Sequence, residues 1–206
     1  MSVSMFAAFW AVSVLFVITP GADWAYAISA GIRGRRVMPA VAGMLGGHLI
    51  ATLIVATGIG SIIAGAPGVL SALTVAGAGY LLWLGIGMLS HPSAPVADQG
   101  EDAGSPLKWA LKGFCISGLN PKVFLLFLAL LPQFTDVHAA WPLPMQMTAL
   151  GLVHVVSCAV VYLLVGYGSG SGTMLRTRPR AAQNVSQISG GLMIIIAVLL
   201  LAEWFF

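Results

Sequence analysis

The stretch FCISGLNPKVFLLFLALLPQF, residues 114–134, decides how the rest of the chain is interpreted. It is long and apolar enough to cross a bilayer, which takes about 20 such residues, yet Asn120, Pro121 and Lys122 lie inside it. A lysine at the centre of a membrane costs about 2.5–3.5 kcal/mol on insertion scales, and a proline removes one helix hydrogen bond. A segment that carries both costs is predicted to line a polar site inside the membrane, not to serve as a passive anchor.

The composition predicts a membrane protein. Of the 206 residues, 59% are hydrophobic and 7% are charged, whereas an ordinary soluble domain carries about 25% charged residues. The length suits one transmembrane domain over residues 1–206. The two cysteines, Cys115 and Cys158, lie in apolar runs without metal-site or disulfide spacing. The sequence shows neither a phosphate loop nor a catalytic constellation, so we expect no enzyme activity, no cofactor and no metal.

Hydropathy divides the chain into six predicted transmembrane helices, because each apolar segment has about 20 residues or more. We expect three helices in a first repeat at about 1–90 and three in a second repeat at about 109–206, joined by a polar cytoplasmic loop at about 91–108. The predicted spans cover residues 5–29, 38–64, 68–90, 110–131, 143–167 and 184–205.

The basic residues predict the orientation of these spans, since cytoplasmic loops of membrane proteins carry an excess of Lys and Arg. The first, third and fifth loops and their flanks hold every basic residue except Lys122, whereas the termini and the other loops hold none. With six spans, this pattern predicts both termini outside and the basic loops in the cytoplasm. The basic residues concerned are Arg33, Arg35, Arg36, Lys108, Lys112, Arg176, Arg178 and Arg180.

Three spans per half predict that the second half enters the membrane in the opposite sense from the first. Transporters built from such inverted repeats bind substrates near the midplane, at broken helices in matching positions. The first span contains a match to Asn120-Pro121-Lys122, namely Thr19-Pro20-Gly21-Ala22-Asp23. Asp23 precedes Arg33 by ten residues and Lys122 follows Lys112 by ten, so each lies about 15 Å from its basic flank. We therefore expect helices one and four to be broken near the midplane.

The two breaks together predict a substrate site. Each proline leaves the carbonyl four residues earlier, that of Phe16 or Ser117, without its usual donor, and the half-helix that follows directs N–H groups toward the gap. Asp23 suits an ammonium group and Lys122 suits a carboxylate, so the predicted ligand is a small zwitterionic amino acid. The alternative is a structural ion pair between these two residues. The expected substrate-binding residues are Thr19, Pro20, Gly21, Asp23, Asn120, Pro121 and Lys122.

Two histidines lie within apolar segments, His48 in the second span and His154 in the fifth. Histidine exchanges protons near neutral pH, and ionisable residues inside a membrane are functional candidates by default. We therefore expect Asp23 and His48 to couple transport to protons. His154 is the weaker candidate, because a lone histidine on a helix is more often a hydrogen-bonded packing residue.

Small and aromatic residues predict packing and anchoring. Gly43, Gly46 and Gly47 allow neighbouring helix backbones to approach closely. Four tryptophans near predicted span ends are expected to be interface anchors. They are Trp10, Trp109, Trp141 and Trp204.

Taken in order and at these spacings, several motifs resemble the LysE/RhtB family of bacterial amino-acid exporters, over essentially the whole chain. The chain departs from the family pattern at Ala22, where a second proline is usual, and at Gly118, where an asparagine is common. The motifs are Thr19-Pro20-Gly21-Ala22-Asp23, the glycine-spaced run from Gly31 to His48, Tyr80-Leu-Leu-Trp-Leu-Gly85, and Phe114 through Asn120-Pro121-Lys122 to Phe134.

The resemblance implies proton-driven export of amino acids or close derivatives across the bacterial cytoplasmic (inner) membrane, often by a homodimer. Because the charges of Asp23 and Lys122 cancel, a neutral substrate of the homoserine, threonine or homoserine-lactone type fits better than lysine. The expected partners are this substrate, protons and lipid, with no nucleic acid. Two alternatives stay open, an inorganic-ion transporter of the same superfamily and a membrane accessory protein without transport. Hard cations prefer several oxygen ligands, and one carboxylate beside one amine suits them poorly.

Overall fold

The computed structural model describes residues 2–33, 36–65, 69–91, 104–170 and 179–205. The side chains of some helical residues, Pro121 and Lys122 among them, lie outside this description. So do most of the predicted polar loop and Arg35, Arg176 and Arg178. Within the described ranges the secondary structure is helical throughout, with no strand. The helices are α1 (Val3–Ile18), α2 (Ala22–Ile32), α3 (Val37–Gly65), α4 (Val69–Ser90), α5 (Pro106–Gly118), α6 (Pro121–Leu130), the short 3-10 helix η1 (Pro132–Phe134), α7 (Leu143–Gly170) and α8 (Pro179–Phe205).

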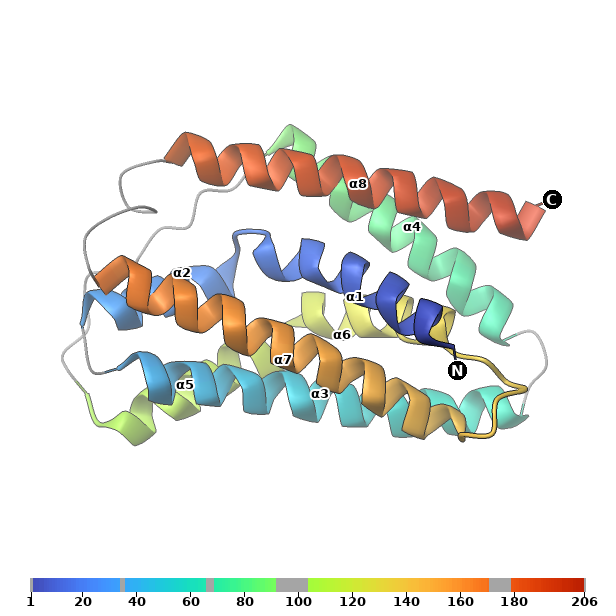
Figure 1. The fold of residues 1–206 in the computed structure, drawn as a ribbon, viewed down its shortest axis with the longest axis horizontal. Helices are drawn as coiled ribbons and strands as arrows, with labels where there is room; N and C mark the ends of the chain where they lie inside the picture. Colours follow the sequence, from blue (N-terminus) through green and yellow to red (C-terminus); the bar gives the residue numbers. More distant parts are fainter. Residues whose placement is uncertain (1, 34–35, 66–68, 92–103, 171–178, 206) are drawn as a thin grey trace.

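The helices run roughly along the long axis of the molecule, and both termini lie at the same end (Figure 1). At the opposite end α2 ends and α3, α5 and α8 begin (Figure 1). We call it the basic end, because the basic residues of the described chain other than Lys122 lie at these helix ends. Its described basic residues are Arg33, Arg36, Lys108, Lys112 and Arg180.

Two helices, α3 over Val37–Gly58 and α7 over Leu143–Ser169, are each long and apolar enough to cross a membrane. Two bent pairs, α1 with α2 and α5 with α6, bring the candidate spans to four if each pair counts as one crossing. In α4 and α8 the described residues include shorter apolar stretches, Val75–Ser90 and Ser186–Leu199. The all-helical class is thus confirmed for the described residues, with two to four candidate spans, whereas six spans in two inverted repeats stay a prediction.

The first predicted break lies between α1 and α2, which are bent by 58°. Thr19 is extended, as the residue before a proline prefers to be, and Gly21 is also extended where α2 begins. Pro20 cannot supply the usual donor to the Phe16 carbonyl, and the backbone N–H of Thr19 takes that place at 3.2 Å. Ala22 is the first residue of α2, a position that accepts most residues as well as proline. Its departure from the family pattern therefore leaves the break intact.

The second predicted break lies between α5 and α6, where the helix axis bends by 48°. The last turn of α5 closes with a hydrogen bond from the Leu119 N–H to the Cys115 carbonyl. α6 then begins at Pro121, a first-turn position where proline costs little because its missing N–H has no partner in a helix. The carbonyl of Asn120 accepts the N–H of Val123 at 3.0 Å. Both breaks thus combine a proline with a new helix start.

Glycines bring α3 and α5 into backbone contact, as predicted for Gly43 and Gly47. A β-carbon on Gly43 would overlap Ala110 of α5, and one on Gly47 would lie 2.5 Å from the backbone nitrogen of Gly118. A β-carbon on Gly118 would in turn lie 3.1 Å from the Cα of Gly47. The absence of a larger side chain at position 118 is therefore explained by this helix crossing.

The two larger apolar cores of the described residues lie one behind the other along the molecule, and a smaller cluster of Leu84, Met88 and Met193 joins α4 to α8. The basic-end core contains residues of α2, α5 and the near halves of α3 and α7, including Tyr26, Met44, Trp109, Cys158 and Tyr162. The distal core contains residues of α1, α4, α6 and the far halves of α3 and α7, including Phe9, Ala51, Phe127, Met147 and Leu150. Trp109 is 5% exposed, so the prediction that it anchors the membrane interface is wrong.

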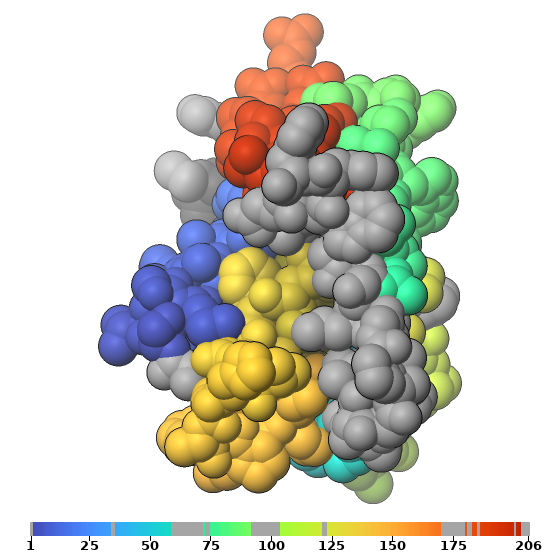
Figure 2. Space-filling model, turned by 90° about the vertical axis from the view of Figure 1, so that its right-hand side faces the viewer, coloured from blue at the N-terminus to red at the C-terminus, as the bar shows by residue number. Residues whose placement is uncertain are grey.

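A short loop segment covers the distal end. The ring of Phe134 in η1 packs edge-on against Phe9 of α1, with 5.6 Å between centroids, and the two segments are neighbours in the view onto this end (Figure 2). The buried amide of Gln146 holds the following loop, because it donates to the carbonyls of Asp136 and Trp141 and accepts the Asp136 N–H. The described loop is therefore tied to the start of α7.

Gly47→Ala is expected to lower the melting temperature of the purified protein, because the added β-carbon would press on the backbone of α5 and overpacking costs about 1–3 kcal/mol. Gly58→Ala on the same helix is the control, since nothing lies within 4 Å of its added β-carbon. That variant should melt no earlier than the parent, because alanine favours a helix by about 0.5–1 kcal/mol over glycine. Thermal unfolding in detergent measures both, and equal melting of the two variants would contradict the close helix contact.

Candidate functional site

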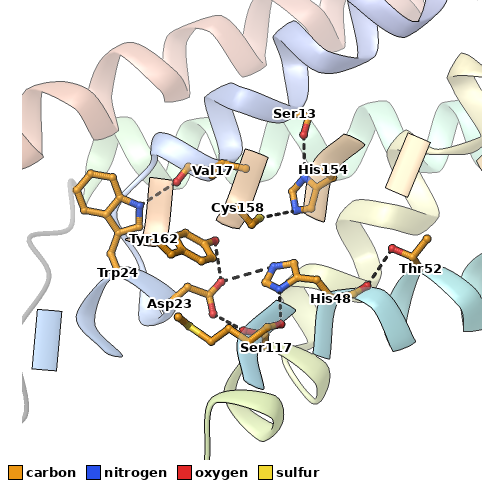
Figure 3. Close-up of polar contacts among 11 residues, drawn as sticks. Ser13, Val17, Asp23, Trp24, His48, Thr52, Ser117, His154, Cys158 and Tyr162 are labelled. Carbon is orange, nitrogen blue, oxygen red and sulfur yellow. Dashed lines mark hydrogen bonds and ion pairs between the residues drawn. The ribbon is translucent and has the colours of Figure 1, made fainter. Parts of the chain in front are cut away.

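Asp23 lies in the first turn of α2, where the positive end of the helix dipole favours a carboxylate. Its side chain is 14% exposed. Ser117 of α5 donates its hydroxyl to Oδ1 at 2.7 Å, and Tyr162 of α7 donates its hydroxyl to Oδ2 at 3.2 Å. Nε2 of His48 on α3 lies 3.8 Å from Oδ2. Three other helices thus direct polar groups at the Asp23 carboxylate (Figure 3).

The orientation of His48 follows from its other nitrogen. Nδ1 lies 2.9 Å from the carbonyl oxygen of Met44, and because a carbonyl can only accept, Nδ1 carries the proton. A neutral His48 then presents the lone pair of Nε2 toward the Asp23 carboxylate, which also only accepts. These two acceptors face each other across a gap and are favourable together only when a proton or another donor lies between them.

A second buried polar group lies next to this pair (Figure 3). Nδ1 of His154 is 2.8 Å from the hydroxyl of Ser13 on α1, and Nε2 is 3.3 Å from Sγ of Cys158, one turn further along α7. The rings of His48 and His154 are 5.4 Å apart between centroids, and the edge of Phe127 packs against His154. Both imidazole nitrogens of His154 therefore have protein partners.

One nitrogen from each of His48 and His154, together with Sγ of Cys158, lies within 4.8 Å of the other two atoms. Nitrogen and sulfur are the donors that soft cations prefer. The spacing of these residues in the sequence did not predict the grouping. His154 and Cys158 already satisfy one another by hydrogen bonding, and His48 faces Asp23. Because hydrogen bonding within the protein accounts for the arrangement, we assign no metal to it.

A cavity of about 60 Å³ adjoins the Asp23 carboxylate. One part of the wall is polar, with Asp23, His48, His154 and Tyr162, and another is apolar, with residues of α1 and α6. The other lining residues are Phe16, Val17, Thr19, Gly21, Ala22, Trp24, Asn120, Val123 and Leu126.

The two histidines separate the two apolar cores. Along α3, Met44 belongs to the basic-end core and Ala51 to the distal core, with His48 between them in sequence. Along α7, Leu150 belongs to the distal core and Cys158 to the basic-end core, with His154 between them. The polar groups around Asp23 therefore form a layer between two apolar cores.

Some of the substrate-binding residues predicted from the sequence line the cavity, whereas Pro20 does not. Thr19, Gly21, Asp23 and Asn120 line the cavity, and His48 adjoins Asp23. Pro20 lies in the bend between α1 and α2, outside the cavity wall described here. The predictions for the side chains of Pro121 and Lys122 fall outside the described residues, although Asn120 and Val123 on either side of them line the cavity.

Sequence reasoning missed Ser13, Ser117, Tyr162 and Cys158 as partners of the polar layer. One signal was available on α7, because His154, Cys158 and Tyr162 follow one another at four-residue spacing and so lie on one face of a helix. A second was Ser117, a polar residue three positions before Asn120 in the quoted stretch. Neither signal shows which side chains from other helices they meet.

Comparison with known proteins identifies relatives along most of the chain. The sequence profile of the family described as LysE type translocator matches residues 14–203. A leucine efflux protein of Klebsiella pneumoniae is 26% identical over 86% of this chain and 85% of that protein. Uncharacterized membrane proteins of Vibrio cholerae and Pseudomonas aeruginosa are 29% and 28% identical, over 81% and 90% of this chain and 80% and 91% of those proteins. No solved structure matches.

Ser13→Ala is expected to destabilise the protein by about 1–3 kcal/mol, because it leaves Nδ1 of the buried His154 without its partner. Adding His154→Leu should recover part of this loss, since removing both polar partners is nearly neutral. Ser4→Ala, at an exposed serine of the same helix, is the control. Denaturation in detergent followed by circular dichroism gives the three values. Equal stability of Ser13→Ala and Ser4→Ala would show that the Ser13–His154 contact contributes nothing.

Proposed function

The chain belongs to the family of LysE type translocators, and on this premise we propose that it exports small amino acids or their derivatives from the cytoplasm by proton antiport. Members of such a family are transporters, not enzymes. The relative named as a leucine efflux protein supports amino acids as the substrate class at family level. Homoserine, threonine and homoserine lactone are the proposed substrates, and leucine joins them because of that relative.

The observation that carries this proposal is the pair of facing acceptors beside the cavity. Oδ2 of Asp23 and Nε2 of His48 are 3.8 Å apart, and one ammonium group between them could donate to both. A charge-assisted hydrogen bond of this kind is stronger than a neutral one. The apolar wall formed by Phe16, Val123 and Leu126 would then contact the rest of the substrate. Asp23 and His48 therefore form the proposed ammonium site.

We assign the substrate carboxylate to the second break. The proposed contacts are the amine of Lys122 and the polar groups of Asn120 at the start of α6, where the helix dipole favours a negative charge. Support comes from Asn120 and Val123, which line the same cavity as Asp23. Pro20 and Pro121 contribute by interrupting the helical hydrogen bonding at the two bends, which makes room for the ligand between them.

Proton coupling follows from competition for the same pair of acceptors. A proton held by Asp23 or His48 supplies the missing donor when the site is empty, and the substrate ammonium supplies it when the site is full. The two ligands exclude each other, because a second positive charge at this buried site would be strongly disfavoured. Exchange of one for the other as the protein changes conformation constitutes antiport.

Alternating access would use the two broken spans. In the proposed arrangement six spans form two inverted halves in the bacterial inner membrane, the basic loops face the cytoplasm and both termini face outward. Rocking of one half against the other would open the site to one side at a time. A homodimer is the proposed assembly, because the family resemblance implies it.

An inorganic-ion transporter is the less favoured alternative. Hard cations require several oxygen ligands, and within the described residues the cavity wall holds one carboxylate, that of Asp23. A membrane accessory protein without transport is likewise less favoured, since such a protein has no need of a charged residue beside a buried cavity, which is costly to maintain.

Asp23→Asn is expected to reduce uptake of labelled homoserine, threonine or leucine into inside-out vesicles at least tenfold, because a charged hydrogen bond contributes about 1.5–3 kcal/mol. Lys122→Met should do the same by removing the carboxylate partner. Asp136→Asn, in the loop before α7, is the matched control and should retain transport. Normal uptake by both site variants would refute the proposed site. Recovery of uptake when Asp23→Lys and Lys122→Asp are combined would favour a structural ion pair.

The antiport itself is tested with a pH gradient. Inside-out vesicles with an acidic lumen should accumulate the amino acid, because protons leave the lumen as substrate enters, and collapse of the gradient with nigericin should abolish accumulation. His48→Gln should weaken this dependence on the gradient more than it weakens exchange of labelled for unlabelled substrate. Accumulation that is equal with and without the gradient would contradict proton coupling.

A further inference from the structure

The cavity at Asp23 is separated from the basic end by packed aromatic side chains. Tyr26 of α2 is 6% exposed and Trp109 of α5 is 5% exposed, and both belong to the basic-end core with Met44 and Tyr162. None of the described cavity-lining residues comes from α5. A substrate that reaches Asp23 from the basic end must therefore displace this core.

One contact ties α2 to α5 inside this core. The hydroxyl of Tyr26 donates to the backbone carbonyl of Trp109 at 2.6 Å, and the two rings stack with 5.2 Å between centroids and 27° between planes. The guanidinium carbon of Arg33, at the end of α2, lies 5.8 Å from the centre of the Trp109 ring, within the range of a cation–π interaction. Hydrogen bond, stacking and cation–π contact all join the same two helices.

A second contact joins these helices at the cavity itself, where Ser117 of α5 donates to Oδ1 of Asp23 on α2. The strength of that hydrogen bond depends on the charge of Asp23, because bonds to an ionised acceptor are about twice as strong as neutral ones. Whatever neutralises Asp23 therefore weakens one of the two attachments of α5 to α2.

From these contacts we propose that α2 and α5, the halves of the broken spans nearest the basic end, form the gate on that side of the site. Tyr26 and Trp109 hold the gate closed, and Ser117 couples it to Asp23. When Asp23 binds a proton or a substrate ammonium, the Ser117 hydrogen bond weakens, and the contacts of Trp109 with Tyr26 and Arg33 remain to be broken. This inference deepens the proposed transport function and rests on it for the identity of the ligand.

The chain contains a reporter for this gate. Cys115 and Cys158 are its only cysteines, and Cys158 is buried in the same core as Trp109. In a Cys115→Ser protein, a membrane-impermeant thiol reagent should label Cys158 slowly in membrane vesicles of either orientation. Adding Trp109→Ala should speed labelling about tenfold or more, from the basic end alone. An epitope tag at the C-terminus, which lies at the opposite end (Figure 1), identifies the face exposed in each preparation.

Two further variants make the test specific. Tyr26→Phe removes the hydroxyl and keeps the ring, and Ser117→Ala removes the donor to Asp23, so each should speed labelling by less than Trp109→Ala. Trp83→Ala, at a tryptophan that is 68% exposed on α4, should leave the rate unchanged. Size-exclusion profiles show whether each variant is folded.

Unchanged labelling in both Trp109→Ala and Tyr26→Phe would overturn the gate, and so would equal acceleration from both faces, which indicates general loosening. The labelling assay needs no substrate, so the two proposals fail separately. If the parent protein transports the amino acid but Trp109→Ala and Tyr26→Phe leave the labelling rate of Cys158 unaltered, the gate alone is refuted. Faster one-sided labelling in a protein that moves no amino acid would refute the transport function and leave the gate.

Discussion

The partly buried carboxylate of Asp23 is the constraint on which the rest of the structure depends. A charged group inside a membrane protein is tolerated only where polar partners surround it, and here those partners come from three other helices, as Ser117, Tyr162 and His48. Each helix must be packed at a defined height and rotation for its polar group to contact the Asp23 carboxylate. The packing of α2, α3, α5 and α7 is therefore coupled to the position of one side chain.

Backbone chemistry makes this arrangement possible. Pro20 ends α1 and allows α2 to begin two residues later, so Asp23 lies in the first turn of a new helix and not in the middle of a long one. Gly47 and Gly118 then let α3 and α5 touch along their backbones, which brings His48 and Ser117 to the same carboxylate. Larger side chains at this crossing would hold the polar groups apart.

The polar layer between two apolar cores gives the fold a shape that suits alternating access. Each core lies on one side of the layer, the basic-end core with most of its residues from α2, α3, α5 and α7 and the distal core with residues of α1 and α6. The histidines extend the layer across the bundle, since the ring of His48 adjoins both Asp23 and the ring of His154. A change in the charge of Asp23 or His48 therefore alters the interactions at the boundary between the basic-end core and the distal core.

What the sequence determined by itself was the membrane environment, the helical class, the two proline breaks and Asp23 and His48 as polar residues of the interior. These follow from composition and from local rules, because a bilayer disfavours charge and a proline in the interior of a helix removes one of its hydrogen bonds. The sequence also indicated close packing at Gly43 and Gly47, since small residues at this spacing allow helices to touch.

Only the tertiary structure decided which groups meet. Ser117 and Tyr162 look like ordinary residues of apolar segments, and Trp109 looked like an interface anchor until its stacking on Tyr26 showed it to be buried. The reason is physical, because hydrogen-bond partners far apart in sequence depend on the rotation and height of whole helices, which are set by packing over many residues at once.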